Sequence, residues 1–196
     1  MKVLKRMNPA KLVSLFFGIP WLFTLIIVLL YKADLTQSQV VLLSGIFLIF
    51  NVIIPFLSLF YLYRSGRISD YDVTERDERF APLTITMFSF LISLILTGLV
   101  GNDLIFEFSA IIFVILLVNL LITFSWKISL HMGINVASSI LINALFDWKL
   151  PFLYLSIPLI YWSRYTLHRH SPRQLIGGLV ISGGITVVGL RYFGYI

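Results

Sequence analysis

The sequence predicts an all-α fold: a single integral membrane domain over residues 1–196, built as a bundle of six to seven transmembrane helices. Hydrophobic residues make up 59% of the chain and charged residues only 12%, whereas a soluble domain carries about 45–50% apolar and about 25% charged residues. The apolar residues gather in runs long enough to span, or nearly span, the hydrocarbon core of a bilayer. These runs lack the alternation of a barrel strand, so helices are the expected spanning elements.

The expected spans follow one another with short polar breaks between them. In chain order they cover about residues 12–31, 39–63, 82–100, 104–125, 130–146, 150–163 and 173–191. Basic residues precede the first span, as they do in a signal peptide. However, this span is long for a signal sequence and no small-residue cleavage site follows it. We therefore expect it to be retained in the membrane.

Two of the later segments differ from the others in composition. Segment 150–163 is short and contains Pro151 and Pro158, which a membrane helix tolerates when neighbouring groups satisfy the freed carbonyls. This segment is the reason that the expected number of spans is six to seven. Segment 173–191 is rich in glycine, which favours close packing of membrane helices.

The distribution of charge predicts an orientation. With seven spans, most of the 15 lysines and arginines fall on the side of the membrane that holds the N-terminus. The positive-inside rule then places this side in the cytoplasm and the chain in the inner or cell membrane. The same rule explains the net charge of +6 without a nucleic-acid partner. The absence of cysteine excludes disulfides, thiol nucleophiles and zinc–thiolate sites, and the sequence does not indicate an oligomeric state.

Three polar segments are expected on this same cytoplasmic side. They cover residues 70–82, 126–131 and 163–174, and they contain histidines and several arginines. Guanidinium groups bind phosphate oxygens in a bidentate fashion. A neutral imidazole can attack phosphorus or transfer a proton near neutral pH. Ionisable groups at the ends of membrane spans are functional candidates, and this combination indicates a phosphate site.

The third polar segment carries a recognisable pattern. Ser163 and Arg164 are followed after five residues by His170, and after three more by Gln174. This resembles the last motif of the type 2 phosphatidic acid phosphatase (PAP2) superfamily, Ser-Arg-x5-His-x3-Asp. Gln174 stands where the family has aspartate.

The other two polar segments carry weaker matches to the same family. Residues 129–131, Ser-Leu-His, resemble the family's Pro-Ser-Gly-His motif. Arg76 and Arg79 precede Pro82, as a basic residue precedes proline in the family's Lys-x6-Arg-Pro motif, although no lysine has the matching spacing. The resemblance covers a PAP2-like core of about residues 70–191.

The resemblance implies a membrane-embedded phosphatase that hydrolyses a lipid phosphate or diphosphate without a metal or other cofactor. By this resemblance, His170 would be the nucleophile that forms a phosphohistidine, and His131 would protonate the leaving alcohol. Gln174 would orient His170, although it brings no negative charge. The residues expected to bind the substrate phosphate are Arg164, Arg76, Arg79 and Ser129.

Several of these residues also have structural explanations. Ser171, Pro172 and Gln174 form the pattern of a capping box that begins the last helix. Arg164 lies among aromatic residues, as an arginine at a membrane interface does. His131 can instead be a buried neutral histidine that bonds between helices.

Two other functions compete with the phosphatase. The acidic residues of segment 70–78, Asp72 and Asp77 among them, could bind Mg²⁺ and a diphosphate. The chain would then resemble a membrane prenyltransferase of the UbiA type, although that family is expected to have two such clusters. The third possibility is a non-catalytic relative that binds a lipid phosphate, which Gln174 favours.

Overall fold

The computed structural model describes residues 8–18 and 20–196, and in these residues it contains helices and no strands. The helices follow the expected apolar runs closely. In chain order they are α1 (Pro9–Phe17), α2 (Trp21–Lys32), α3 (Gln37–Ile46), the π-helix η1 (Phe47–Ile53), α4 (Ile54–Arg64), the 3₁₀ turn η2 (Asp77–Arg79), α5 (Phe80–Val100), α6 (Asp103–Thr123), α7 (Leu130–Leu145), the 3₁₀ helix η3 (Pro151–Leu155), α8 (Ser156–Thr166) and α9 (Pro172–Tyr192).

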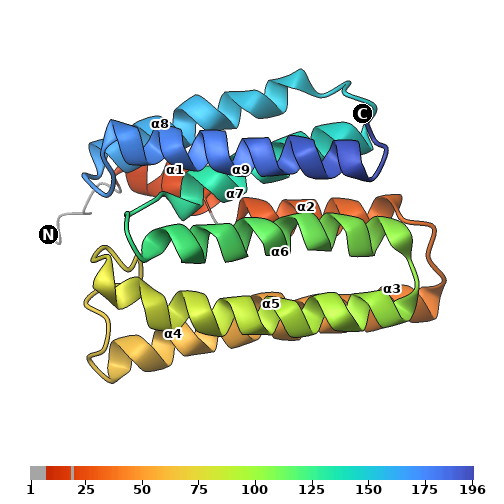
Figure 1. Cartoon of the computed structure of the whole chain (residues 1–196), viewed down its shortest axis with the longest axis horizontal. Coiled ribbons are helices and arrows are strands. Elements are labelled where there is room, and N and C mark those ends of the chain that lie inside the picture. Colours follow the sequence, from red (N-terminus) through yellow and green to blue (C-terminus); the bar gives the residue numbers. More distant parts are fainter. Residues whose placement is uncertain (1–7, 19) are drawn as a thin grey trace, which may run out of the picture.

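The helices lie side by side along the long axis of the molecule and alternate in direction (Figure 1). Helices α8 and α9 form one side of the bundle, α4 and α5 form the other, and α2 and α6 lie between them. The loops after α4, α6 and α8 all lie at the same end, on the left in Figure 1. The three polar segments therefore meet at one end of the bundle, as the sequence predicts.

Five helical segments are long and apolar enough to cross a membrane, which makes this a membrane protein. They are Pro9–Lys32, Gln37–Arg64, Asp77–Val100, Asp103–Thr123 and Pro172–Tyr192. The first contains two helices, because α1 ends at Gly18 and α2 begins at Trp21. The single span expected over 12–31 is thus broken close to Pro20, whose nitrogen has no hydrogen to donate to a helix.

The two remaining expected spans are helical but short. Segment 130–146 corresponds to α7, which has 16 residues and a length of about 24 Å, less than the roughly 30 Å of a hydrocarbon core. Segment 150–163 corresponds to η3 followed by the 11-residue helix α8. Length and composition alone therefore identify five spans and leave these two segments as shorter helices within the bundle.

The π-helix in the second long segment is followed by a proline, and a neighbouring helix supplies the hydrogen bond that this proline cannot donate. Pro55 lacks the N–H that would donate to the carbonyl of Phe50 in the i to i−5 pattern of a π-helix. The hydroxyl of Ser89, on α5, donates to this carbonyl instead. Such compensation permits proline within a membrane helix, and here it joins η1 to α5.

Glycines allow α7 and α9 to approach closely, as the composition of the last span predicts. A Cβ atom on Gly178 would lie 2.6 Å from the carbonyl oxygen of Ser129, and one on Gly133 would lie 2.4 Å from Oγ of Ser182. Neither position has room for a side chain. This close packing of small residues holds the start of α7, with His131, beside the start of α9, which follows His170.

Candidate functional site

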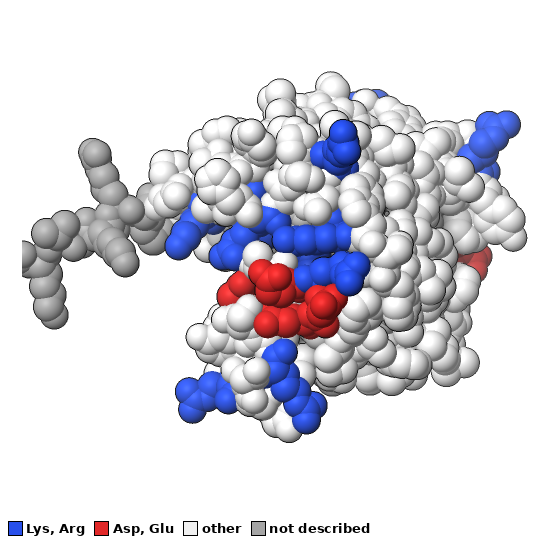
Figure 2. Space-filling view, turned by 60° about the vertical axis from the view of Figure 1, so that its left-hand side comes forward, with Lys and Arg blue, Asp and Glu red and all other residues white. Residues whose placement is uncertain are grey.

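Acidic and basic side chains are gathered at the loop end of the bundle (Figure 2). The carboxylates of the 70–78 segment lie directly beside a group of lysines and arginines. The basic residues come from parts of the chain that are far apart in sequence. The site is therefore built by the tertiary fold.

Arg79 connects the first polar segment to the second. Its side chain is only 5% exposed. Its Nε donates to the carbonyl oxygen of Val73 and its Nη1 to that of Ile128, both at 2.9 Å. Both acceptors are backbone carbonyls, so neither hydrogen bond pairs the positive charge of Arg79 with a carboxylate. Arg79 thus contributes positive charge to the site from a firmly held position.

Arg164 connects the third polar segment to the first. Its side chain is 1% exposed, and its Nη1 donates to Oγ of Ser14 at 2.9 Å and to Oδ2 of Asp72 at 3.2 Å. Nε of Arg169 lies 3.4 Å from the same oxygen of Asp72. One carboxylate therefore lies between two guanidinium groups. Nε of Arg164 is buried and has no hydrogen-bond partner among the described residues.

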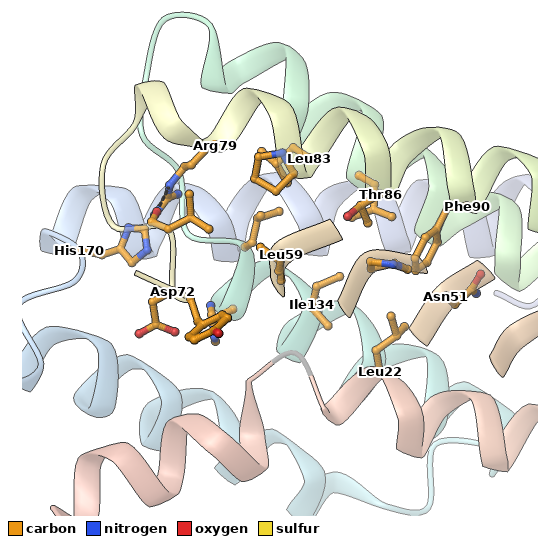
Figure 3. A pocket seen from close by; sticks show the side chains of 17 residues that line it. Leu22, Asn51, Leu59, Asp72, Arg79, Leu83, Thr86, Phe90, Ile134 and His170 are labelled. Carbon is orange, nitrogen blue, oxygen red and sulfur yellow. Dashed lines mark hydrogen bonds between the residues drawn. The ribbon is translucent and has the colours of Figure 1, made fainter. Parts of the chain in front are cut away.

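A cavity of about 200 Å³ begins beside these arginines and extends into the bundle (Figure 3). Its polar end is lined by Asp72, Arg79, His131 and His170, and the rest of its wall is mainly apolar. His131, the second residue of α7, also borders a separate cavity of about 350 Å³ that is lined by Lys11, Ser14 and Arg169. The imidazole of His131 therefore stands between an apolar cavity inside the bundle and a polar one beside α1.

Gly18 makes room for His131 in this position. A Cβ atom on Gly18 would lie 2.5 Å from Cδ2 of the imidazole. The break between α1 and α2 thus allows the histidine to sit against the first membrane segment. This role of Gly18 is not apparent from the apolar pattern of the segment, although the Gly-x-Pro pattern of Gly18 and Pro20 is a helix-breaking signal.

His170 is the most isolated ionisable group of the site. It is 6% exposed, lines the cavity in the loop before α9, and its Nδ1 has no hydrogen-bond partner in the part of the chain that the structure describes. Burial is the main reason that the pKa of His170 is lowered from 6.5 to about 2, and the positive charges of Arg79, Arg164 and Lys127 contribute to the same shift. The imidazole is therefore neutral near pH 7, with a free ring nitrogen in a positively charged environment.

This protonation state predicts an acid-sensitive fold. The unfolded chain binds a proton on His170 below its ordinary pKa of 6.5, whereas the folded chain does not. Stability is therefore complete above pH 6.5 and falls as the pH decreases below it, by about 2 kcal/mol at pH 5. Thermal unfolding in detergent between pH 5 and 7.5 measures this loss. A His170→Asn variant should show a smaller dependence, and an equal dependence in both proteins would refute this assignment.

Three residues predicted for the site have other partners in the structure. Ser129 caps α7 and accepts from the backbone N–H of Met132. Oε1 of Gln174 accepts from the backbone N–H of Ser171 at 3.0 Å, which confirms the predicted capping box. Arg76 is exposed and pairs with Asp77 at 3.0 Å. None of these three residues lines the cavity beside His170.

The acidic segment has a role that the sequence analysis did not identify. Asp72 pairs with Arg164 and Arg169, Asp70 pairs with Arg169, and Asp77 pairs with Arg76. Among the described residues, no three histidine, aspartate or glutamate side chains gather as ligands of a metal ion would. The carboxylates of Asp70 and Asp72 instead hold the arginines of the third segment in place. Sequence spacing could not indicate these pairs because their members lie more than 90 residues apart.

Comparisons with known proteins add no identification. The chain matches no protein-family model, no curated protein and no solved structure.

Proposed function

We propose that the protein binds a lipid phosphate or diphosphate in this cavity and hydrolyses it, as a divergent member of the PAP2 superfamily. The observation that carries the proposal is the cavity itself. Its polar end combines the buried Arg79 with a buried imidazole that has a free Nδ1, next to the carboxylate of Asp72, and the rest of its wall is mainly apolar. An amphiphile with an anionic head group fits both parts of the cavity: the head group binds at the polar end, and the apolar tail lies among the helices.

The proposed chemistry uses the histidines as a pair. A ring nitrogen of His170 attacks phosphorus, so that a P–N bond forms as the P–O bond to the lipid breaks. A ring N–H of His131 gives its proton to the departing lipid oxygen. Water, deprotonated by His131, then attacks the phosphohistidine, releases phosphate and restores His170. Arg79, and Arg164 from behind Asp72, stabilise the charge on the phosphoryl oxygens.

The experiment is a phosphate-release assay in EDTA. Purified protein is incubated with lipid phosphates in detergent micelles, and inorganic phosphate is measured. Release that persists in EDTA is expected. Activity that disappears with the chelator would contradict this proposal and favour the magnesium-dependent prenyltransferase.

A second function, lipid-phosphate binding without hydrolysis, is favoured by one observation. Oε1 of Gln174 accepts a hydrogen bond within the helix cap and is therefore not free to accept one from His170. Among the described residues, Nδ1 of His170 has no hydrogen-bond partner and so no carboxylate bound to it. A nucleophilic histidine normally has such a partner. If this second function holds, the protein will bind a lipid phosphate in EDTA but release no phosphate from it.

We also propose that α7 and the η3–α8 segment complete seven passes of the chain, with the N-terminal side and the site in the cytoplasm. The end that carries the three polar segments is rich in lysine and arginine (Figure 2), which supports this orientation. The chain lacks cysteine, so single cysteines can report on it. Arg67→Cys in cells should react with a membrane-impermeant thiol reagent only after permeabilisation, and Lys149→Cys should react without it. The reverse pattern would overturn the orientation. Equal reactivity of both before permeabilisation would mean an even number of passes between residues 67 and 149 and would overturn the crossing of α7.

A further inference from the structure

The cavity is elongated and follows one face of α5. Arg79, Leu83, Thr86 and Phe90 all line it; Arg79 is the residue before α5, and the other three stand at successive turns of that helix (Figure 3). Arg79 lies at the polar end, and Phe90 lies at the far end (Figure 3). Eleven residues of helix separate them, which corresponds to about 16 Å. The cavity thus reaches about half the depth of a hydrocarbon core of roughly 30 Å.

The wall along this path is suited to a hydrocarbon chain. Helices α2, α4, α5, α6 and α7 contribute apolar side chains, namely Leu22, Leu59, Leu83, Leu116 and Ile134. The volume of about 200 Å³ is below the roughly 300–1,000 Å³ of pockets that enclose drug-sized ligands. A slender single chain fits such a space better than two chains side by side.

The far end of the cavity is closed by three side chains that also border another space. Leu22, Asn51 and Phe90 line the main cavity and a second, smaller one of about 20 Å³ beyond it. Leu22 and Phe90 are 5% and 7% exposed. Figure 3 shows Leu22, Asn51 and Phe90 grouped at the end opposite to His170. These residues therefore form a partition between two mainly apolar spaces, and Oδ1 of Asn51 in it is buried without a hydrogen-bond partner among the described residues.

We propose that this cavity binds a single-chain lipid phosphate and selects it by the length of its tail. The phosphate lies at Arg79 and His170, and the end of the tail lies against the partition of Leu22, Asn51 and Phe90. This inference rests on the proposed function and names its substrate class. Carbon–carbon bonds of about 1.5 Å at angles near 111° advance about 1.25 Å per carbon. A path of about 16 Å therefore accommodates about 13 carbons.

Two substitutions should change the preferred length in opposite directions. Phe90→Ala removes part of the partition and joins the two cavities, so longer tails should fit. Thr86→Phe places a ring one helical turn closer to the head group, about 6 Å, and should shorten the preferred tail by about five carbons. Phe88→Ala is the matched control, because Phe88 lies on the same helix but is 55% exposed.

The test uses the full chain in nanodiscs of phosphatidylcholine. Octyl, dodecyl and hexadecyl phosphate compete with radiolabelled dodecyl phosphate, and the ranking of the three is compared between variants, so that their different partitioning into lipid cancels. Relative to the wild type, hexadecyl phosphate should gain at least about tenfold over dodecyl phosphate in Phe90→Ala, a few methylene groups being enough for such a change. Octyl phosphate should gain in Thr86→Phe, and the ranking should not change in Phe88→Ala.

The outcomes separate this inference from the proposed function. Thr86→Phe keeps the core ring of Phe90. If the ranking of the three phosphates is unchanged in this variant, selection by tail length is overturned, whereas the phosphate site is not. Two-chain phosphatidic acid that competes as well as dodecyl phosphate would overturn the single-chain assignment. Dodecanol that competes as well as dodecyl phosphate would overturn the phosphate site itself.

Discussion

Phosphate release from a lipid phosphate is expected to fall at least about a thousandfold when His170 is replaced by asparagine. Removal of a nucleophile eliminates the covalent route and leaves only the contribution of binding and of fixed positive charge. Asparagine keeps a polar side chain of similar reach in the buried position, so the loss should reflect chemistry. The initial rate of phosphate release in EDTA, with protein folding checked by thermal unfolding, measures the effect.

His168→Asn is the matched control for this prediction. His168 lies two residues earlier, is exposed, and has a positive φ of 53°, which asparagine tolerates well. Its replacement should leave phosphate release within about twofold of the wild type, as expected for a side chain outside the cavity. If His170→Asn is as active as His168→Asn, the phosphohistidine route is excluded.

The second large effect concerns stability and follows from Asp72. Replacement of Asp72 by alanine leaves the guanidinium of Arg164, which is 1% exposed, without its carboxylate partner. Loss of one member of a buried ion pair costs about 3–5 kcal/mol. We expect about 3 kcal/mol here because the Asp72 side chain is 33% exposed and water screens the pair. For a chain of this size, the unfolding temperature should fall by about 6–12 °C.

Asp77→Ala provides the comparison for Asp72→Ala. The pair of Asp77 and Arg76 is formed by side chains that are 83% and 43% exposed, and such surface pairs contribute about 0–1 kcal/mol. Its loss should therefore barely change the unfolding temperature. Differential scanning fluorimetry of both variants in the same detergent makes the comparison. An equally small change in both would show that Asp72 does not compensate the charge of Arg164.

The helices and their ends could be predicted largely from local sequence. Long apolar runs predict membrane helices in any tertiary context because a backbone in lipid must satisfy its own hydrogen bonds. The capping box of Ser171 and Gln174 was likewise predictable, since its two bonds join residues three positions apart. The break near Gly18 was missed, because a run of apolar residues does not reveal where the chain bends, whereas the bounds predicted for α7, 130–146, agree with Leu130–Leu145.

The candidate site was predictable only in part. The sequence indicates that arginines and histidines gather on one side, because the spans return the polar segments there. It does not indicate which of them share a cavity. Arg79 and His170 both line it, whereas Arg76, three residues before Arg79, points to Asp77 at the surface.

The sequence by itself thus determined a membrane protein of antiparallel helices with most of its basic residues at one end, because hydrophobicity and helix capping act over a few residues. The tertiary structure alone decided which charges meet. The contact of Arg164 with Asp72 spans 92 residues, and that of Arg79 with the carbonyl of Ile128 spans 49. Such pairs depend on how α4 to α9 pack against one another, and only that packing places a neutral histidine with Arg79 at the polar end of a mainly apolar cavity.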